Sequence, residues 1–298
     1  MQSTDDRLLR IRNAFPDLDI QSVEENYEGL VNDVIVINGE RVCRFAKEEW
    51  ARPPMWKEGR ILHLVRPRMQ VNIPYWDYME EDFISYRKLF GRPLRRQMIQ
   101  RLPEKTQDGL AEQMANFYRA MRSFSGDEVL AAGIGDSDAL RSIDIYAGYY
   151  EKAKELLYPS IYDHMRDTLD EIFLPVLTGQ LSMEYDLRLI HADTGPHHIL
   201  FDDEAQRISG ILDFGTGGLG DPAMDIGNTL SCYGETFVRR MARYDDEIRG
   251  FIERARFYAA EVEVWWVLIG LEKNEPSWMF VHLMTARDRL PPLSGNLY

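Results

Sequence analysis

Short runs of apolar, often β-branched residues between turn residues predict β-strands in the N-terminal part of the chain, from about residue 16 to 88. Val34–Ile37 and Glu40–Phe45 are rich in β-branched and apolar residues, and Asn38-Gly39 joins them. Asn-Gly favours a two-residue type I′ turn because both positions take positive φ angles. We therefore predict an antiparallel hairpin over residues 34–45.

Three further elements follow the hairpin. Trp56–Leu64 has helical spacing, whereas the Pro-bounded segment around Ile73-Pro74 and the segment Asp82–Leu89 are typical of strands. Residues 16–88 as a whole are therefore predicted to be rich in strands.

The second half of the chain has helical periodicity. From Thr106, a plausible N-cap, apolar residues recur at steps of three and four, which places them on one helix face. Residues 148–181 and 233–290 are also predicted to be mainly helical. Between them, Ile199–Phe201 and Arg207–Leu212 are two short strands joined by an Asp-rich turn.

Composition narrows the class of protein. Of 298 residues, 45% are hydrophobic and 28% charged, as in a globular protein with a substantial core. The excess of acidic over basic residues gives a net charge of −14, which argues against nucleic acids and anionic membranes as partners and favours a cationic ligand. Neither the charged N-terminal stretch nor any apolar run resembles a signal peptide or a membrane span. We expect a cytoplasmic monomer whose two cysteines, Cys43 and Cys232, are buried thiols.

The residues that carry chemistry gather between positions 189 and 228. A buried strand ends at His191-Ala192-Asp193, His198 follows five residues later, and a second strand ends at Asp213. A tight hairpin would bring His198 and Asp213 together beside Asp193. One carboxylate to orient a nucleophile and two donors to hold a cation suit phosphoryl transfer, although an imidazole is an unusual ligand for magnesium.

The motifs in this stretch resemble those of the aminoglycoside phosphotransferases, antibiotic kinases that share the protein-kinase fold. His191–Asp202, Gly210–Gly215 and Gly220–Asp225 all match in order and spacing. Within that family, His198 in place of the usual Asn is similar to the 2''-aminoglycoside and macrolide phosphotransferases. The resemblance implies an α+β, bilobal fold, with a small antiparallel-sheet lobe over residues 1–87 and a large, mainly helical lobe over residues 88–298.

The resemblance also implies roles for individual residues of the catalytic region. Asp193 would be the catalytic base, and His198 and Asp213 would hold magnesium ions that bridge the nucleotide phosphates. His191 would brace the catalytic loop. Asp221 and Asp225 would both order the loop after the metal site. Asp221 would also lie close enough to contact the substrate.

In the N-terminal half, the resemblance implies a nucleotide site for ATP or GTP. Residues 26–33, including Asn32, correspond to the loop over the triphosphate. Arg44 stands where kinases carry a nucleotide-binding Lys, and Glu58 stands for its helix partner. Arg keeps the charge but is longer and planar. Residues 85–89, including Ser85, Tyr86 and Lys88, correspond to the hinge whose backbone contacts the purine.

The substrate is expected to be a small-molecule antibiotic. Aminoglycosides are polycations, and carboxylates of the C-terminal helices are candidates to bind them. Trp265, Trp266 and the apolar segment Trp278–Met284 could instead line a pocket for a macrolide. The candidate substrate contacts are Asp221, Glu235, Glu261, Glu263, Glu272, Glu275 and Trp278.

A catalytically silent, kinase-like binding protein is a further alternative. Arg44 and the glycine-poor phosphate loop favour it, whereas the intact set of Asp193, His198 and Asp213 argues against it.

Overall fold

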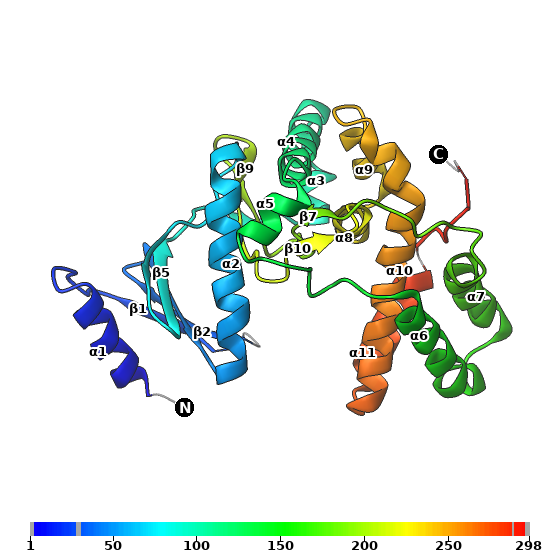
Figure 1. The fold of residues 1–298 in the computed structure, drawn as a ribbon, viewed down its shortest axis with the longest axis horizontal. Helices are drawn as coiled ribbons and strands as arrows, with labels where there is room; N and C mark the ends of the chain where they lie inside the picture. Colours follow the sequence, from blue (N-terminus) through cyan, green and yellow to red (C-terminus); the bar gives the residue numbers. More distant parts are fainter. Residues whose placement is uncertain (1–2, 28–30, 288, 296–298) are drawn as a thin grey trace.

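The computed structural model describes residues 3–27, 31–287 and 289–295 and has two lobes (Figure 1). The smaller lobe is built on a five-stranded antiparallel sheet in the order β1-β2-β3-β5-β4. Its strands are β1 (Val23–Asn26), β2 (Asn32–Ile37), β3 (Arg41–Ala46), β4 (Trp76–Met79) and β5 (Phe83–Arg87). The long helix α2 (Arg52–Val65) lies between this sheet and the larger lobe.

The predicted hairpin is confirmed as β2–β3. Asn38 and Gly39 have φ angles of 55° and 65°, as a type I′ turn requires, and Val34 pairs with Arg44 across the ladder. Because strand side chains alternate between faces, Ile35 and Cys43 point to one face of the sheet and Val34 and Arg44 to the other. The hairpin register therefore decides which face Arg44 occupies.

Helix α1 (Thr4–Ala14) covers the face of the sheet opposite to Arg44. Ser3 caps it, with reciprocal bonds between Ser3 and Asp6, and Ile11 packs into a buried cluster with Ile35, Ile37, Cys43, Phe45 and Phe83. On the other face, Met55 of α2 packs with Val42, Ile84 and Tyr86. Sequence analysis did not predict α1, although the Ser-x-x-Asp capping pattern was visible in the chain.

The larger lobe is mainly helical around two short sheets. Strand β6 (Arg92–Pro93) pairs with β8 (Ile199–Asp202), β8 pairs with β9 (Arg207–Ile211), and β7 (Arg188–Ile190) pairs with β10 (Gly218–Gly220). Its helices are α3 (Arg96–Ile99), α4 (Glu104–Arg122), α5 (Gly126–Ala131), α6 (Ile143–Leu156), α7 (Asp163–Leu177), α8 (Ala223–Tyr233), α9 (Glu235–Met241), α10 (Glu247–Glu272) and α11 (Pro276–Arg287).

The bilobal α+β architecture is confirmed, and two local predictions need correction. Helix α4 begins at Glu104 with Pro103 as its N-cap, so Thr106 lies inside the first turn. No strand forms at Ile73-Pro74, because Ile73 is buried in the core of the larger lobe and β4 begins at Trp76. No helix in the described part of the chain is long and apolar enough to cross a membrane.

Candidate active site

Strand β7 and the β8–β9 hairpin bring the predicted catalytic residues together. Asp193 follows β7, His198 immediately precedes β8, and Asp213 follows β9. The Nδ1 atom of His198 lies 3.5 Å from Oδ1 of Asp193, and its Nε2 atom lies 3.6 Å from Oδ2 of Asp213. The hairpin thus places one imidazole between two carboxylates, as its sequence predicts.

Asp225, near the start of α8, fixes the backbone that carries Asp193. Its carboxylate accepts hydrogen bonds from the backbone N–H of Ala192 at 2.8 Å and of His191 at 3.2 Å. Ala192 has a φ of 66°, a left-handed conformation that costs energy for a residue with a Cβ. Burial raises the pKa of Asp225 to about 6, although these two N–H groups act in the opposite direction.

His191 connects the catalytic loop to the end of β9. The ring is fully buried and lies near Phe117 and Phe214. Nδ1 accepts the Asp193 N–H at 3.2 Å, which leaves Nε2–H to donate to the carbonyl of Leu212 at 3.1 Å. Burial lowers the pKa of His191 to about 4, so the neutral ring holds this loop at neutral pH.

His198 is the titratable centre of the cluster. Burial alone would lower its pKa, but the hydrogen bond to Asp193 and the charges of Asp193 and Asp213 outweigh burial and raise the pKa to about 9. For Asp193, burial acts to raise the pKa. The hydrogen bond and charge of His198 outweigh burial, so the pKa of Asp193 lies below its ordinary value. Asp193 therefore stays a carboxylate near neutral pH, ready to accept a hydrogen bond from a substrate hydroxyl.

The donor set can accommodate a divalent cation. Ligand atoms of Asp193, His198 and Asp213 all lie within 4.8 Å of one another. The Nδ1 atom of His198 contacts the Asp193 carbonyl at 2.8 Å, which leaves Nε2 on the side of Asp213. His198 and Asp213 would therefore hold the ion, and a hard cation such as magnesium would there neutralise phosphate charge.

Across the cleft, Arg44 and Glu58 form a buried ion pair. The Arg44 Nη1 atom lies 2.9 Å from a Glu58 carboxylate oxygen, and the two side chains are 12% and 1% exposed. Burial alone would lower the pKa of Arg44, but the charges of Glu58, Tyr86 and Asp213 raise it above its ordinary value. The charge of Arg44 therefore interacts with Asp213 on the other side of the cleft.

A cavity of about 590 Å³ lies between the two lobes and joins these groups. It is lined by the ion pair, by Asp193, His198 and Asp213, and by Asn32 and Tyr86. The Oδ1 atom of Asn32 is buried without a hydrogen-bond partner among the described residues. A ligand in this cavity could satisfy that oxygen. Of the predicted phosphate loop, residues 28–30 lie outside the described residues.

The structure corrects two of the predicted hinge contacts. Ser85 lies inside the sheet, between Cys43 on β3 and Tyr78 on β4, so its backbone is paired within the sheet. The N–H of Lys88 donates to the Glu40 carbonyl at 2.7 Å, and its side chain lines a different depression. Of the three named hinge residues, Tyr86 alone lines the cleft.

The predicted substrate residue Asp221 already has internal partners. It is fully buried, accepts from Nε of Arg254 at 2.7 Å and from the Tyr258 hydroxyl at 3.0 Å, and caps the start of α8 through the Ala223 N–H. Arg254 carries the charge that a cationic substrate would otherwise supply. The structure therefore assigns Asp221 a positioning role and not a direct contact with substrate.

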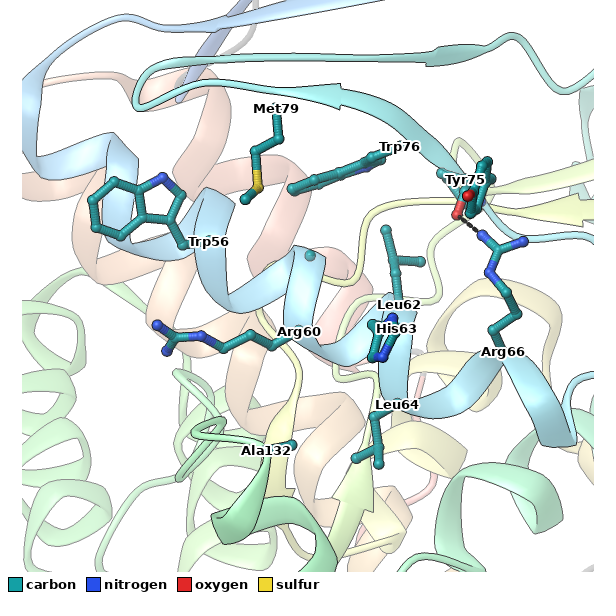
Figure 2. A pocket seen from close by; sticks show the side chains of 12 residues that line it. Trp56, Arg60, Leu62, His63, Leu64, Arg66, Tyr75, Trp76, Met79 and Ala132 are labelled. Carbon is teal, nitrogen blue, oxygen red and sulfur yellow. Dashed lines mark hydrogen bonds between the residues drawn. The ribbon is translucent and has the colours of Figure 1, made fainter.

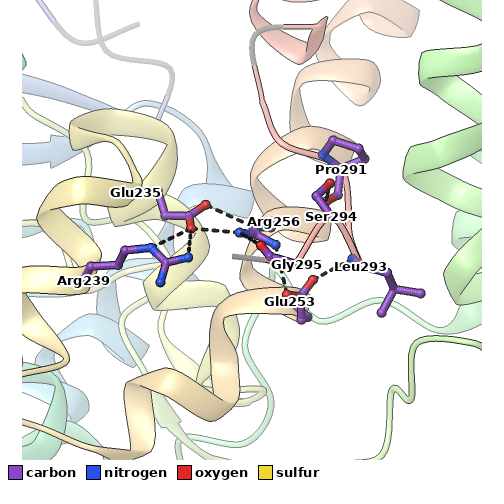
Figure 3. A network of polar contacts seen from close by, with 8 residues as sticks. All are labelled: Glu235, Arg239, Glu253, Arg256, Pro291, Leu293, Ser294 and Gly295. Carbon is purple, nitrogen blue, oxygen red and sulfur yellow. Dashed lines mark hydrogen bonds and ion pairs between the residues drawn. The ribbon is translucent and has the colours of Figure 1, made fainter. Parts of the chain in front are cut away.

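Glu235 is likewise part of the internal structure (Figure 3). Its carboxylate accepts from Arg239 and from the fully buried Arg256, which also binds Glu253 and the carbonyl of Gly295. This network ties α9, α10 and the segment after α11 together. Glu235 is therefore corrected from a substrate contact to a structural residue.

The remaining candidates differ in where they lie. Glu263 accepts from Ser231 at 3.3 Å and contacts Nδ1 of His282 at 2.7 Å. Burial raises the pKa of the nearby Cys232 thiol to about 11, and the charges of Asp193 and Glu263 act in the same direction. Glu272 is exposed and paired with Lys152. Trp278 packs edge-to-face on Trp266 at a centroid distance of 5.6 Å.

Glu261 and Glu275, also named as substrate candidates, differ in exposure. Glu261 is buried, and burial raises its pKa to about 8. Glu275 is exposed, at the start of α11.

Sequence reasoning missed several residues that build the site. Lys57 of α2 pairs with Asp138 at 2.7 Å, and Asp138 and Trp50 also line the interlobe cavity. The Tyr118 hydroxyl bonds Thr194 and Thr229 beneath the catalytic loop. Apart from Thr194, which follows Asp193 in the catalytic loop, none of these residues stands in a motif, and only the fold brings them to the site.

The two lobes, the buried ion pair and the cluster of Asp193, His198 and Asp213 define a kinase-like phosphotransferase fold. The chain belongs to the phosphotransferase enzyme family, whose sequence model matches residues 20–285. It is thereby a phosphotransferase.

Two solved structures are similar to this chain over most of its length, and one curated relative is similar over part of it. The GDP and kanamycin complex of an aminoglycoside 2''-phosphotransferase is 28% identical and covers 95% of this chain and 97% of its own, with a TM-score of 0.82. A type I macrolide 2'-phosphotransferase shares the fold, with 17% identity, a TM-score of 0.69, and coverage of 96% of this chain and 98% of its own. The uncharacterized protein YcbJ of Bacillus subtilis (strain 168) is 23% identical over 208 residues, which are 65% of this chain and 64% of that protein.

Proposed function

We propose that this protein transfers the γ-phosphoryl group of ATP or GTP, with magnesium, to a hydroxyl of an aminoglycoside. The observation that carries the proposal is the convergence of Asp193, His198 and Asp213 on one wall of the cavity that Arg44 and Glu58 line from the other lobe. A base, a cation site and a phosphate-binding guanidinium on one cavity are the parts that phosphoryl transfer needs.

The nucleotide would lie with its phosphates between Arg44 and Asp213. Glu58 holds the guanidinium in place, and Arg44 can chelate phosphate oxygens with its planar fork. The intact trio of Asp193, His198 and Asp213 favours an active enzyme over a silent binding protein. A relative solved with GDP and kanamycin supports a nucleotide donor and an aminoglycoside acceptor.

On the substrate side, Glu263 is the carboxylate we propose for an ammonium group. It is buried and contacts Ser231 of α8, the helix whose Asp225 holds the backbone before Asp193. Asp221 and Glu235 make hydrogen-bonded ion pairs with arginines, so fewer anionic groups face the acceptor than the sequence suggests. The arginine near Glu263, Arg289, lies 3.8 Å from its carboxylate, beyond hydrogen-bond distance. The acidic surface of the whole chain would still attract a polycation.

A macrolide is the second candidate acceptor, favoured by one observation. Trp266 stacks on His282 at 5.7 Å and meets Trp278 edge-to-face, and His282 contacts Glu263. An aromatic wall beside a single carboxylate suits a bulky, weakly cationic amphiphile as well as a polycation.

The deciding experiment is turnover with purified protein, magnesium, ATP or GTP, and separate aminoglycosides and macrolides. We expect nucleotide-dependent addition of one phosphoryl group to an aminoglycoside, detected by mass spectrometry, and no addition with Asp193→Asn. Phosphorylation confined to macrolides would support the second candidate. No acceptor-dependent turnover with any member of the panel would contradict both.

A further inference from the structure

A second cavity lies outside the interlobe cleft, on the other side of α2. Its volume is about 550 Å³, within the range of small-molecule sites. Figure 2 shows Met79 and Trp76 of β4 above α2, with Trp56 at one end and Arg66 and Tyr75 at the other. None of the catalytic or nucleotide-binding residues described above lines it.

The walls of this cavity are aromatic and apolar, and they are open to solvent. Trp56, Tyr75 and Met79 are 37%, 62% and 60% exposed, which is unusual for three large apolar side chains on one cavity. Leu62 and Leu64 of α2 also line the cavity. Exposed apolar surface gathered around a concave site is typical of a ligand site.

The shape of the cavity depends on Gly59. A Cβ on this residue would lie 2.6 Å from the Trp76 ring, so glycine lets the indole lie flat against α2. The Nε1–H of Trp76 is buried and has no hydrogen-bond partner among the described residues. A buried unpaired donor is costly, and an acceptor on a ligand would remove that cost.

The charges around the cavity have one sign. Its lining includes Arg60 and Arg66 and, among the described residues, no Asp or Glu, in a protein of net charge −14. Arg60 donates to the Gly133 carbonyl, and Arg66 donates to the Pro74 carbonyl and stacks on Tyr75 at 4.3 Å. A guanidinium has five N–H donors, so both retain donors for an anion.

We propose that this cavity binds a small amphipathic anion, a flat apolar body that carries one carboxylate or sulfonate. The body would pack along α2 against Met79 and the edge of Trp76, and the anionic group would meet Arg66 at the open end. The cavity also includes Ala132, next to the carbonyl that Arg60 binds, so an occupant contacts both lobes. It would lie on the helix that carries Glu58 without entering the nucleotide cleft.

The test uses 8-anilinonaphthalene-1-sulfonate as the anionic probe and N-phenyl-1-naphthylamine as its neutral counterpart, each titrated by fluorescence into the full chain. Arg66→Ala is the test variant. Arg68→Ala is the matched control, because Arg68 is two residues away and engages Phe124, Ser123 and Glu128 instead. Met79→Glu, at an exposed side chain, adds a repelling charge without removing buried packing.

We expect saturable binding of the sulfonate that persists at saturating ATP. Arg66→Ala should raise its Kd at least about tenfold, as for the loss of a charge-assisted hydrogen bond, and leave the neutral probe within about twofold. Met79→Glu should also weaken binding of the sulfonate, and Arg68→Ala should bind it as the unmodified protein does. The three variants should keep the melting temperature of the unmodified protein. Displacement of the probe by ATP, or equal affinity in all four proteins, would overturn the proposal.

Discussion

Arg44 and Glu58 lie 14 positions apart in the chain, on a strand and a helix, and their side chains meet in a buried pair at 2.9 Å. The pair forms because the β2–β3 register turns Arg44 toward α2, and the helical spacing of α2 turns Glu58 toward the sheet. The pair fixes a guanidinium on the wall of the cavity opposite Asp213.

Removing Arg44 should affect nucleotide use more than folding. For Arg44→Ala we expect the KM for the nucleotide to rise by about tenfold to a hundredfold, because a desolvated charge-assisted contact to phosphate is lost. Arg41→Ala is the matched control, an arginine on the same strand that binds Asp77 instead. An unchanged KM in Arg44→Ala, measured by steady-state kinetics, would mean that Arg44 does not face the phosphates.

Replacing Asp193 should affect turnover, whereas replacing Asp213 should affect binding of magnesium-nucleotide. Asp193→Asn removes the anionic acceptor for the substrate hydroxyl, so kcat should fall by about 10²–10⁴-fold while calorimetric binding of magnesium-nucleotide survives. Asp213→Asn removes a charged oxygen ligand and should weaken that binding itself. The reverse result, with binding lost in Asp193→Asn and intact in Asp213→Asn, would exchange the two roles.

Magnesium binding should depend on pH through His198. With its pKa raised to about 9, the ring is protonated at neutral pH, and a protonated ring cannot ligate a metal. Magnesium affinity should therefore rise with pH up to about 9 and fall on acidification, with release of a proton. Calorimetry in buffers of different ionisation enthalpy measures that proton. His198→Asn, which offers an oxygen that does not titrate, should lose this pH dependence; retention of it would assign the proton to another group.

The loss of stability on replacing Asp225 should depend on pH. Its pKa is raised from 3.8 to about 6, so folding favours its protonated form. Stability from this group is therefore present at low pH and is lost as pH rises through 6. Asp225→Asn should accordingly lower the melting temperature more at pH 4.5 than at pH 7.5. Equal losses at both pH values would show that the carboxyl does not titrate in this range.

Glu263 should govern the acceptor and not the nucleotide. Glu263→Gln keeps the shape and removes the charge, so the KM for a cationic acceptor should rise by about tenfold with the nucleotide KM unchanged. Glu272→Gln, on the same helix but paired with Lys152 at the surface, is the control. A rise in both acceptor and nucleotide KM would indicate a general disturbance of the lobe.

The sequence alone determined the hairpin, the chemistry of the catalytic loop and the family resemblance. These features depend on short-range rules: Asn-Gly turns the chain between β2 and β3, and a strand must end before Asp193 and Asp213 can leave the core. Because the β8–β9 hairpin is local, the contact between His198 and Asp213 could be predicted from spacing.

Only the tertiary structure decided which carboxylates remain open to a ligand. Asp221 and Glu235 read as surface acids until Arg254 and Arg256 of α10 are placed beside them. Such pairs join residues 21 to 33 positions apart, on different segments of the chain, and no periodicity encodes their contact. Ser85 likewise looks like a hinge residue until strand pairing places its backbone inside the sheet. Burial and charge compensation arise from packing between elements, so they become visible only once the elements are assembled.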